Sequence, residues 1–534
     1  MKKTVGSYLI ECLEAHGVRH VFGIPGVHNL ELYRGLTRSG IRHVTGRHEQ
    51  GLGFMADGYA RTSGRPGVCF TITGPGLTNI VTAMGQAYAD SIPMVVISSE
   101  NARADIGTGC GHLHELPDQL GLAAKVSASA ERVEQGGDLP DVLARAFVAA
   151  TGGRPRPAYI EIPRDVLATD VHGLPAPASG RYLPPPQPAT AEGIAEAARR
   201  LARARAPVLL VGGGALGAAA EIKNLAEHLG APVVMTINAR GLLPPQHPLG
   251  VSMTASLAPV RAMIGAADAV LAVGTELGPT DYDMYAASEL SQLRELIRID
   301  VDEAQLYRNA RPALALRGHA RETLRGILAA GLGAVRAPWG EATVPSVRAE
   351  AQKLLSAPIR REIAFLEVIR DTVANAILVG DSTQPVYAGN VGFAAATPGS
   401  WFNSATGYGT LGYAVPASTG AGLSAPDRPI VCLVGDGGIQ FSLGELAVPR
   451  DVDAWSAIVV WNNRGYGEIK TSMLAVDIEP EGVNVQPPDF SHLARAYGYG
   501  YRFIEDLESL ERALHDFASR RQVLVLEIRA AGFE

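Results

Sequence analysis

The stretch IVCLVGDGGIQFSLGELA, residues 430–447, decides how this chain is interpreted. It begins with an apolar run, 430–434, that reads as a buried β-strand, and it ends in a helix-like segment, 443–447. The turn between them, 435–438, reads Gly-Asp-Gly-Gly. A glycine-rich turn between a strand and a helix points backbone N–H groups and the positive end of the helix dipole at an anion, typically a phosphate. Asp436 in that turn suits a hard cation shared with the phosphate.

A second polar turn follows the next apolar run along the chain. Residues 457–461 read as a strand, and Asn-Asn-Arg-Gly at 462–465 comes directly after it. Asp436 and Asn463 are one strand–helix–strand step apart (463 − 436 = 27), which brings both to neighbouring carboxyl ends of one sheet. The Asp436 carboxylate, the Asn463 amide oxygen and the Gly465 carbonyl, with two phosphate oxygens and a water, would give the octahedral shell that Mg²⁺ demands. A single Gly-Asp-Gly is otherwise a plain turn, but the two turns together predict a metal and phosphate site.

Short runs rich in Val and Ile recur along the whole chain and alternate with helix-like stretches. Strands that read as continuous apolar runs between helices indicate parallel sheets covered on both faces. Two Pro- or Gly-rich stretches, 171–190 and 331–356, are predicted linkers, and they divide the chain into domains at 1–170, 191–330 and 357–534. The expected fold class is therefore α/β, with three doubly wound parallel-sheet domains.

Composition narrows the class of protein further. The chain has 534 residues, of which 47% are hydrophobic and 19% charged, and this balance excludes global disorder. Its net charge of −7, without a basic block, makes nucleic acid and anionic membranes poor partners. The four cysteines form no CxxC pair, and the first residues lack the uninterrupted apolar segment of a secretion signal. We expect a cytoplasmic protein that acts on a small molecule, with no nucleic-acid or membrane partner.

The turn 435–437, followed after this interval by Asn462 and Asn463, resembles the signature of thiamine-diphosphate enzymes. The whole chain resembles the acetolactate synthase and 2-oxo-acid decarboxylase superfamily. In chain order, the resemblance implies a pyrimidine-binding domain, a middle Rossmann-like domain and a diphosphate-binding domain. It implies thiamine diphosphate and Mg²⁺ as cofactors, and a homodimer or homotetramer whose active sites lie at the subunit interface.

The same resemblance assigns roles to single residues. Glu49 matches the glutamate that hydrogen-bonds N1′ of the aminopyrimidine, and a carboxyl group there favours the imino tautomer, whose 4′-nitrogen removes the C2 proton intramolecularly. By position, Leu411 is the apolar buttress that folds the cofactor, and the Gly409 carbonyl accepts from the 4′-amino group. The remaining cofactor-binding residues implied by the resemblance are Gln384, Gly435, Asp436, Gly437, Gly438 and Asn463.

Residues 105–119 match a loop that reaches over the reactive carbon in the superfamily. Acetolactate synthases have Phe-Gln-Glu there and pyruvate-type decarboxylases a His-His pair, whereas this chain has Leu-His-Glu, ending at Glu115. We predict His114 as a catalytic proton donor or carboxylate partner, with a structural role as the alternative, and His112 and Glu115 as further substrate residues. Glu468 lies one residue before the position of the catalytic glutamate of pyruvate decarboxylases, so it is predicted to meet a cationic substrate tail.

Segments 22–33 and 112–119 look most like the bacterial 2-ketoarginine decarboxylase branch. Those proteins convert 5-guanidino-2-oxopentanoate to 4-guanidinobutanal and CO₂, and a guanidinium favours an acidic, planar partner such as Glu115, Asp118 or Glu468. The expected reaction is therefore non-oxidative decarboxylation of a 2-oxo acid. The alternative is an acetolactate-synthase-like carboligase, in which the decarboxylated fragment joins a second carbonyl instead of taking a proton.

The middle segment offers a competing interpretation. Residues 212–217 fit a GxGxxG turn after the apolar run 208–211, but the next run ends at Asn238 and not at the acidic residue that a dinucleotide site wants. An NAD-dependent dehydrogenase is therefore disfavoured. Acetolactate synthases hold FAD in this domain with an Arg-Phe-Asp-Asp-Arg-like segment, from which 274–281 departs, so we expect no bound FAD.

Overall fold

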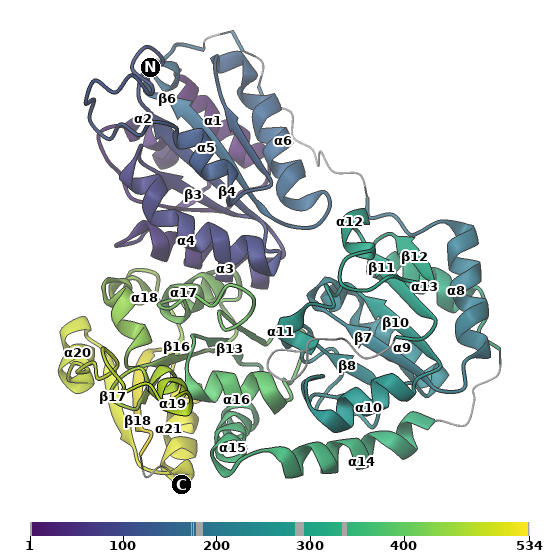
Figure 1. Cartoon of the computed structure of the whole chain (residues 1–534). Helices are drawn as coiled ribbons and strands as arrows, with labels where there is room; N and C mark the ends of the chain where they lie inside the picture. The colour runs from purple at the N-terminus through teal and green to yellow at the C-terminus, as the bar shows by residue number, and fades with distance from the viewer. Residues whose placement is uncertain are drawn as a thin grey trace.

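Three sheets of six strands each form the body of the molecule in the computed structural model (Figure 1). The structure describes residues 3–171, 173–174, 176–177, 185–282, 293–333, 339–531 and 533. Neighbouring strands within the three sheets are parallel, and helices cover both faces of each sheet. The expected α/β class with three doubly wound domains is confirmed.

The N-terminal sheet has the strand order β2-β1-β3-β4-β6-β5. Its strands β3, β4 and β6 are buried along their whole length, which is why their sequences are nearly continuous apolar runs. The strands are β1 (His20–Gly23), β2 (Arg42–Thr45), β3 (Gly67–Thr71), β4 (Met94–Glu100), β5 (Ser129–Arg132) and β6 (Pro157–Pro163). The helices are α1 (Val5–Ala15), α2 (Leu30–Tyr33), α3 (Glu49–Ser63), α4 (Pro75–Asp90), α5 (Gln119–Ala124), α6 (Leu139–Thr151) and α7 (Arg164–Leu167).

The middle sheet has the order β12-β11-β10-β7-β8-β9, so the winding reverses between β7 and β10. Such a reversal leaves a crevice at the carboxyl ends of the two strands. The strands are β7 (Pro207–Val211), β8 (Val233–Met235), β9 (Gly250–Val251), β10 (Ala269–Val273), β11 (Leu296–Asp300) and β12 (Leu314–Arg317). The helices are α8 (Ala191–Arg203), α9 (Ala219–Leu229), α10 (Ala258–Ala266), α11 (Pro279–Tyr282), α12 (Glu303–Leu306) and α13 (Ala320–Ala329).

The stretch 331–356, expected to be a linker, contains the helix α14 (Trp339–Leu354). Val344, Val347 and Ala351 are buried in one hydrophobic cluster with residues of α10, and their spacing of three and four positions is that of one helical face. The scattered prolines obscured this period, because Pro345 lies inside the helix itself. Most of this stretch is therefore part of the middle domain's packing.

The C-terminal sheet has the order β14-β13-β15-β16-β18-β17, the same relative order as the N-terminal sheet. The strands are β13 (Ile377–Gly380), β14 (Trp401–Asn403), β15 (Ile430–Gly435), β16 (Ser456–Asn462), β17 (Gly500–Ile504) and β18 (Val523–Arg529). The helices are α15 (Ala357–Thr372), α16 (Gln384–Gly392), α17 (Ala414–Ser424), α18 (Val448–Asp451), α19 (Gly467–Ala475), α20 (Phe490–Tyr497) and α21 (Leu507–Ser519), with a 3₁₀ segment, η5 (Gly438–Ala447), after β15.

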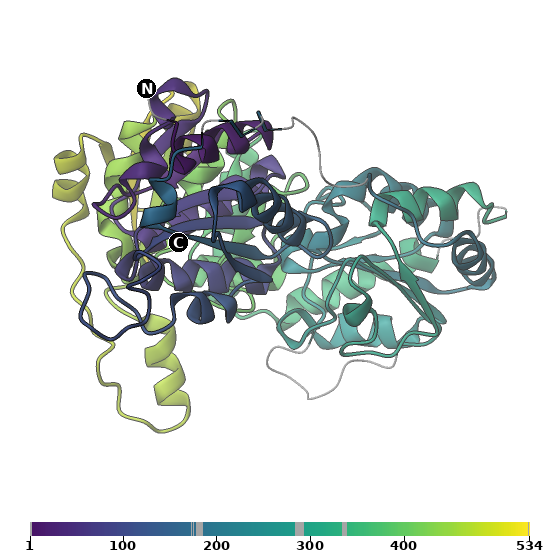
Figure 2. The same cartoon turned by 90° about the horizontal axis from the view of Figure 1, so that it is seen from above.

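The N-terminal domain rests on the C-terminal domain through α3 and α17, and the middle domain lies beside both (Figures 1 and 2). The two helices cross at backbone contact. A Cβ at Gly58 would lie 2.0 Å from the Ala417 carbonyl oxygen, and one at Gly420 would lie 1.9 Å from that of Met55. Glycine is therefore required on both helices for this approach.

Within the part of the chain that the structure describes, no helix is both long and apolar enough to cross a membrane.

Candidate active site

The predicted metal turn lies at the carboxyl edge of the C-terminal sheet. Gly435 pairs with Trp461 across β15 and β16, so Asp436 leaves the sheet beside the end of β16. The Asp436 side chain is buried, and its carboxylate accepts hydrogen bonds from the backbone N–H groups of Asn463 (3.1 Å) and Gly465 (2.9 Å). Burial raises the pKa of Asp436, and these N–H donors oppose that rise.

Three oxygen atoms converge at this turn. Oδ1 of Asn463 lies 2.7 Å from the Gly465 carbonyl oxygen and 3.1 Å from Oδ1 of Asp436. Adjacent ligands of an octahedral Mg²⁺ with bonds of ~2.1 Å lie about 3 Å apart, so this orientation of the amide fits a hard cation. The opposite orientation would instead let the Asn463 nitrogen donate to both oxygens. The residues present therefore fit the expected metal, with Asp436, Asn463 and Gly465 as its ligands.

This donor set has only one carboxylate. Among the described residues no cluster of three His, Cys, Asp or Glu side chains could hold a metal ion. An amide oxygen and a backbone carbonyl are nevertheless ordinary ligands for a hard cation.

Gln384 begins α16 and supports the same turn. Its Oε1 accepts from Nε1 of Trp461 (3.1 Å) and from Nδ2 of Asn463 (3.2 Å), so it orients the Asn463 amide. Gly437 allows a close approach, because a Cβ there would lie 2.8 Å from the ring of Tyr466. Gly437 and Gly438 stand where β15 gives way to η5, in the position predicted for phosphate binding.

Gly409 and Leu411 lie on the loop between β14 and α17. Gly409 is exposed and has a positive φ of 76°, and Leu411 is half-buried. The carbonyl of Thr410, between them, accepts a hydrogen bond of 2.7 Å from Oγ of Ser404. The loop is therefore held at Thr410, while its two predicted cofactor-contacting neighbours are less buried.

Glu49 is the first residue of α3 and lies at the carboxyl edge of the N-terminal sheet. Its carboxylate accepts from Nδ2 of Asn79 on α4 (2.9 Å). The preceding turn is fixed from the C-terminal domain, because Glu445 accepts from the N–H groups of Arg47 (2.9 Å) and His48 (2.8 Å). Sequence reasoning missed Glu445, since a lone Glu in a helix-like segment carries no distinguishing signal.

The substrate loop presents His114 to a second histidine. His114 has a positive φ of 63°, and its ring meets that of His28 edge-on, with centroids 5.1 Å apart. His28 is buried, and its Nδ1 has no hydrogen-bond partner among the residues that the structure describes. Burial and the neighbouring His114 lower the pKa of His28. His28 was not predicted as a site residue, although it lies within the 22–33 segment that carries the resemblance.

Glu115 is occupied by its own loop. Its two oxygens accept from the backbone N–H groups of Gly109 (2.6 Å), Gly111 (2.9 Å) and His112 (3.0 Å), which hold the pKa of the carboxyl below its ordinary value. The His112 side chain lies near Asp105, with Nε2 3.6 Å from a carboxylate oxygen. The Glu115 carboxylate is therefore bound to its own loop.

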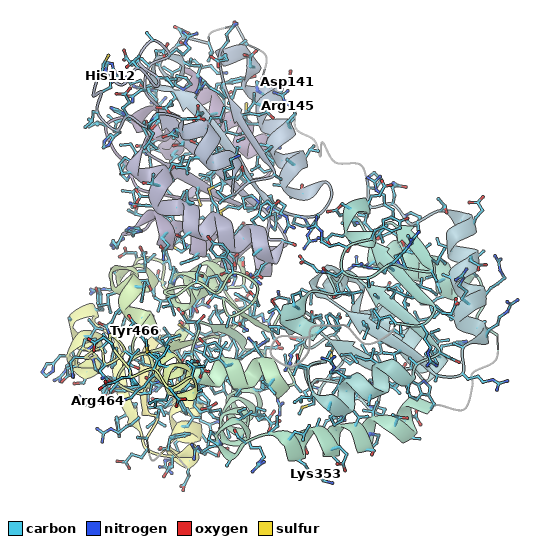
Figure 3. All side chains as sticks on the ribbon, viewed as in Figure 1. His112, Asp141, Arg145, Lys353, Arg464 and Tyr466 are labelled. Carbon is cyan, nitrogen blue, oxygen red and sulfur yellow. The ribbon has the colours of Figure 1, made fainter. Side chains whose placement is uncertain are left out.

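Glu468 lies on a different domain from the other predicted substrate residues. It is exposed in the first turn of α19, and burial together with nearby Glu468 raises the pKa of Glu362 to about 7. Figure 3 shows His112 in the N-terminal domain and Tyr466, beside the metal turn, in the C-terminal domain, well apart in that view. The structure thus brings the predicted metal ligands together but leaves the predicted substrate residues on two different domains of one chain.

A cavity of about 540 Å³ lies at the crevice of the middle sheet. Residues 212–214 after β7, Gly274 after β10 and Asp300 at the end of β11 line it, together with part of the segment 274–281. The space is large enough for a small organic ligand. The expectation that FAD is not bound there stays a prediction.

Comparison with known protein families assigns all three domains. Residues 3–122 match the N-terminal binding domain of thiamine pyrophosphate enzymes, 194–327 the central domain and 381–528 the C-terminal binding domain. Both turns described above fall within the matched segments.

Individual relatives match over nearly the whole chain. The chain is 46% identical to the probable 2-ketoarginine decarboxylase AruI of Pseudomonas aeruginosa, over 99% of this chain and 94% of the relative. It is 32% identical to the large subunit of acetolactate synthase isozyme 1 of Escherichia coli, over 87% and 82% of the two chains. An acetolactate synthase of Arthrospira platensis is 29% identical over 100% of this chain and 95% of its own. The chain belongs to the thiamine pyrophosphate enzyme family, and within it resembles the 2-ketoarginine decarboxylase branch.

Proposed function

We propose that this enzyme decarboxylates 5-guanidino-2-oxopentanoate to 4-guanidinobutanal and CO₂, with thiamine diphosphate and Mg²⁺ as cofactors. The observation that carries the proposal is a three-oxygen turn fit for Mg²⁺ in a chain 46% identical, end to end, to a probable 2-ketoarginine decarboxylase. Thiamine diphosphate, when bound, supplies an electron sink for the electron pair left as CO₂ departs. The protein's part is to bind, orient and exclude water.

In this proposal Asp436, Asn463 and Gly465 hold Mg²⁺, and Gln384 keeps the Asn463 oxygen turned toward the metal. The N–H groups of Gly435, the last residue of β15, and of Gly437 and Gly438 beyond it face the diphosphate. Glu49 binds the aminopyrimidine, with its carboxylate oriented by Asn79. Leu411 and the Gly409 carbonyl contact the cofactor from the loop that precedes α17.

On the substrate side, we assign the 2-oxo acid to the His114 loop, with His112 nearby. His28 supports His114 by its edge-on ring contact, and its Nδ1 bonds to none of the described residues. We assign the guanidinium to Glu468 and not to Glu115, because backbone N–H groups already fill the Glu115 carboxylate. Glu468 is exposed in the first turn of α19, so its side chain is open to a cation.

The active site requires a second copy of the chain in this proposal, as a homodimer or homotetramer. The substrate loop and α19 belong to different domains of one chain, and no residue of α19 is buried in the part of the chain described. Ile469 and Leu474 on that helix are 53% and 58% exposed, which suits burial against a partner. We keep the domain limits 1–170 and 357–534 and a cytoplasmic location as parts of the proposal, and extend the middle domain from 191–330 to include α14.

The test is turnover by the purified protein with thiamine diphosphate and Mg²⁺, offered 5-guanidino-2-oxopentanoate and pyruvate in parallel. CO₂ release and a product with the mass of 4-guanidinobutanal, with pyruvate a poor substrate, are the expected results. Acetolactate from pyruvate, with the guanidino acid inert, would overturn the proposal in favour of the carboligase. The acetolactate synthase relatives make that the outcome to exclude.

A further inference from the structure

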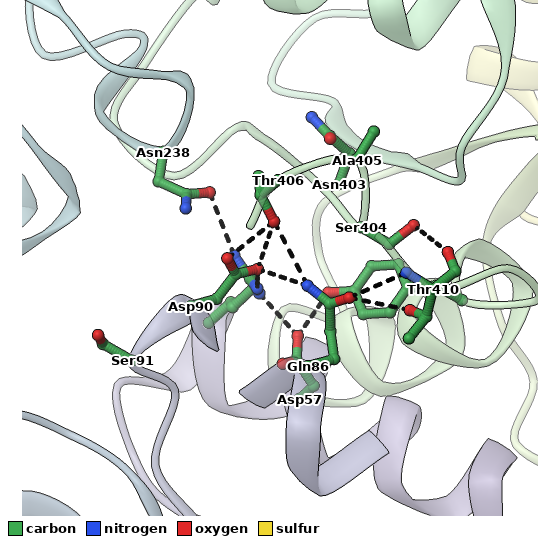
Figure 4. Close-up of polar contacts among 12 residues, drawn as sticks. Asp57, Gln86, Asp90, Ser91, Asn238, Asn403, Ser404, Ala405, Thr406 and Thr410 are labelled. Carbon is green, nitrogen blue, oxygen red and sulfur yellow. Dashed lines mark hydrogen bonds and ion pairs between the residues drawn. The ribbon is translucent and has the colours of Figure 1, made fainter. Parts of the chain in front are cut away.

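A buried glutamine of the N-terminal domain holds the loop that carries Gly409 and Leu411 (Figure 4). Gln86 lies on α4 and is fully buried. Its Oε1 accepts from the backbone N–H of Thr410 (3.3 Å) and from Oγ1 of the same residue (2.9 Å). Its Nε2 donates to Oδ2 of Asp90 (2.9 Å). The amide therefore uses both its acceptor and its donor, and its orientation is fixed.

An ion network anchors Gln86 in turn. Arg61 donates to Asp57 (2.6 Å) and to Asp90 (2.5 Å), and its Nη1 donates to Oδ1 of Asn238 in the middle domain (3.3 Å). Tyr413, next to the first residue of α17, donates to Asp57 (2.5 Å). Burial raises the pKa of Asp57, while Arg61 opposes that rise. Buried charges persist when they are paired and hydrogen-bonded in this way, so the three domains meet at a rigid point.

We propose that Gln86 is a positioning residue that sets the direction of the Gly409 carbonyl and the place of Leu411; this rests on the proposed function. The Gly409 carbonyl and the Thr410 N–H belong to one planar peptide unit. Holding the Thr410 N–H with Gln86 therefore fixes where the Gly409 carbonyl points. Ser404 holds the Thr410 carbonyl on the other side, which fixes the peptide unit that leads into Leu411.

The loop needs these hydrogen bonds because Gly409 has no side chain that could fix its conformation. A Cβ at Gly409 would meet no atom within 4 Å, and its positive φ is one that glycine adopts freely. Tyr408 rests on α4 at Gly85, where a Cβ would lie 2.6 Å from the tyrosine ring. The loop 404–413 therefore packs against α4 at Gly85 and Gln86.

A glutamine amide can accept from Thr410 and donate to Asp90 at the same time. A methionine at position 86 would keep the volume and lose every hydrogen bond, and a glutamate would face Asp90 with a second carboxylate. Gln86→Met therefore releases the loop without opening a large cavity.

The first readout needs no cofactor. In the unliganded protein, hydrogen–deuterium exchange of the segment 404–413 should rise in Gln86→Met. Gln305→Met is the matched control and should leave that segment unchanged, because Gln305 is a buried glutamine of α12 whose Oε1 has no partner in the described part of the chain. Unchanged exchange at 404–413 in a folded Gln86→Met protein would overturn the proposal.

The second readout is C2–H exchange of bound thiamine diphosphate, followed by quenched-flow NMR. Gln86→Met should slow it about ten-fold or more, since small misplacements of positioning groups have effects of that size, while cofactor affinity changes only a few-fold. Exchange at the unmutated rate in the variant would overturn this inference alone, and no exchange in the unmutated protein would overturn the proposed function. Should Gln86→Met fail to fold, Ser404→Ala is the second variant. It removes the 2.7 Å donor to the Thr410 carbonyl and leaves the longer contact from Oγ of Ser382 (3.5 Å), so it must slow exchange in the same way or the inference fails.

Discussion

The N-terminal and C-terminal sheets have the same strand order, yet their carboxyl edges are built differently. In the C-terminal sheet, the ends of β15 and β16 bring Asp436, Asn463 and Gly465 within 3.1 Å of one another. In the N-terminal sheet, the corresponding edge carries a long loop, 105–118, in which the predicted substrate residue Glu115 binds the loop's own backbone. Adjacent strand ends hold their polar groups close together before any ligand binds. In a long loop, the positions of the polar groups depend instead on the loop's own hydrogen bonds.

Among the predicted site residues at the carboxyl edges of the two sheets, replacing Glu49 should have the largest effect on the reaction. Glu49→Gln should slow C2–H exchange of bound thiamine diphosphate by about 10²–10³-fold, within the range for general acid–base groups, and leave cofactor affinity nearly intact. Quenched-flow NMR measures the exchange and calorimetry the affinity. Glu192→Gln, at an exposed first-turn glutamate of α8, is the control. Exchange at the unmutated rate in Glu49→Gln would remove Glu49 from its assigned role.

The metal turn is tested by Asp436→Ala. We expect Mg²⁺-dependent binding of thiamine diphosphate to weaken about 100-fold, because loss of a carboxylate ligand leaves two neutral oxygens for the cation. Titration calorimetry with Mg²⁺, and again with a chelator, separates the metal-dependent part. Asp427→Ala, at an exposed acid, should bind like the unmutated protein, and the same affinity in Asp436→Ala would contradict the site.

The same contrast explains what could be predicted from the sequence. The strand–turn–helix pattern around Asp436 and the spacing to Asn463 are local, so the α/β class and the approach of Asp436 to Asn463 follow from the order of residues. The hydrogen bond from Thr410 to Gln86 joins positions 324 residues apart, and the contact between His28 and His114 depends on how two loops fold together. No local period carries such information. The helix α14 was missed for a different reason, because prolines masked its apolar face.

The crossing of α3 and α17, where the N-terminal and C-terminal domains meet, should lose stability when a single methyl group is added. Gly58→Ala places a Cβ 2.0 Å from the Ala417 carbonyl oxygen, so α3 and α17 must move apart, at a cost of about 1–3 kcal/mol for overpacking. We expect a lower melting temperature by calorimetry. Gly265→Ala, in α10, meets no atom within 4 Å and should keep or raise the melting temperature. Equal melting temperatures for Gly58→Ala and the unmutated protein would mean that the two domains are not held at this crossing.

The smallest effect on catalysis is expected at the predicted substrate residues, Glu468 and Glu115, which lie on the C-terminal and N-terminal domains. Glu468→Gln should raise the KM for the guanidino acid about ten-fold, as for loss of one charge-assisted hydrogen bond, and change kcat less. Glu115→Gln should instead lower kcat with little change in KM, because it loosens the loop that carries His114 and does not touch the guanidinium.

The comparison of these two variants needs a substrate without the cationic tail. With an uncharged 2-oxo acid of similar length, Glu468→Gln should match the unmutated enzyme, whereas Glu115→Gln should remain impaired. The opposite pattern would place the guanidinium at the substrate loop. The N-terminal edge would then have to rearrange on binding, since Glu115 must give up three backbone donors before it can accept a ligand.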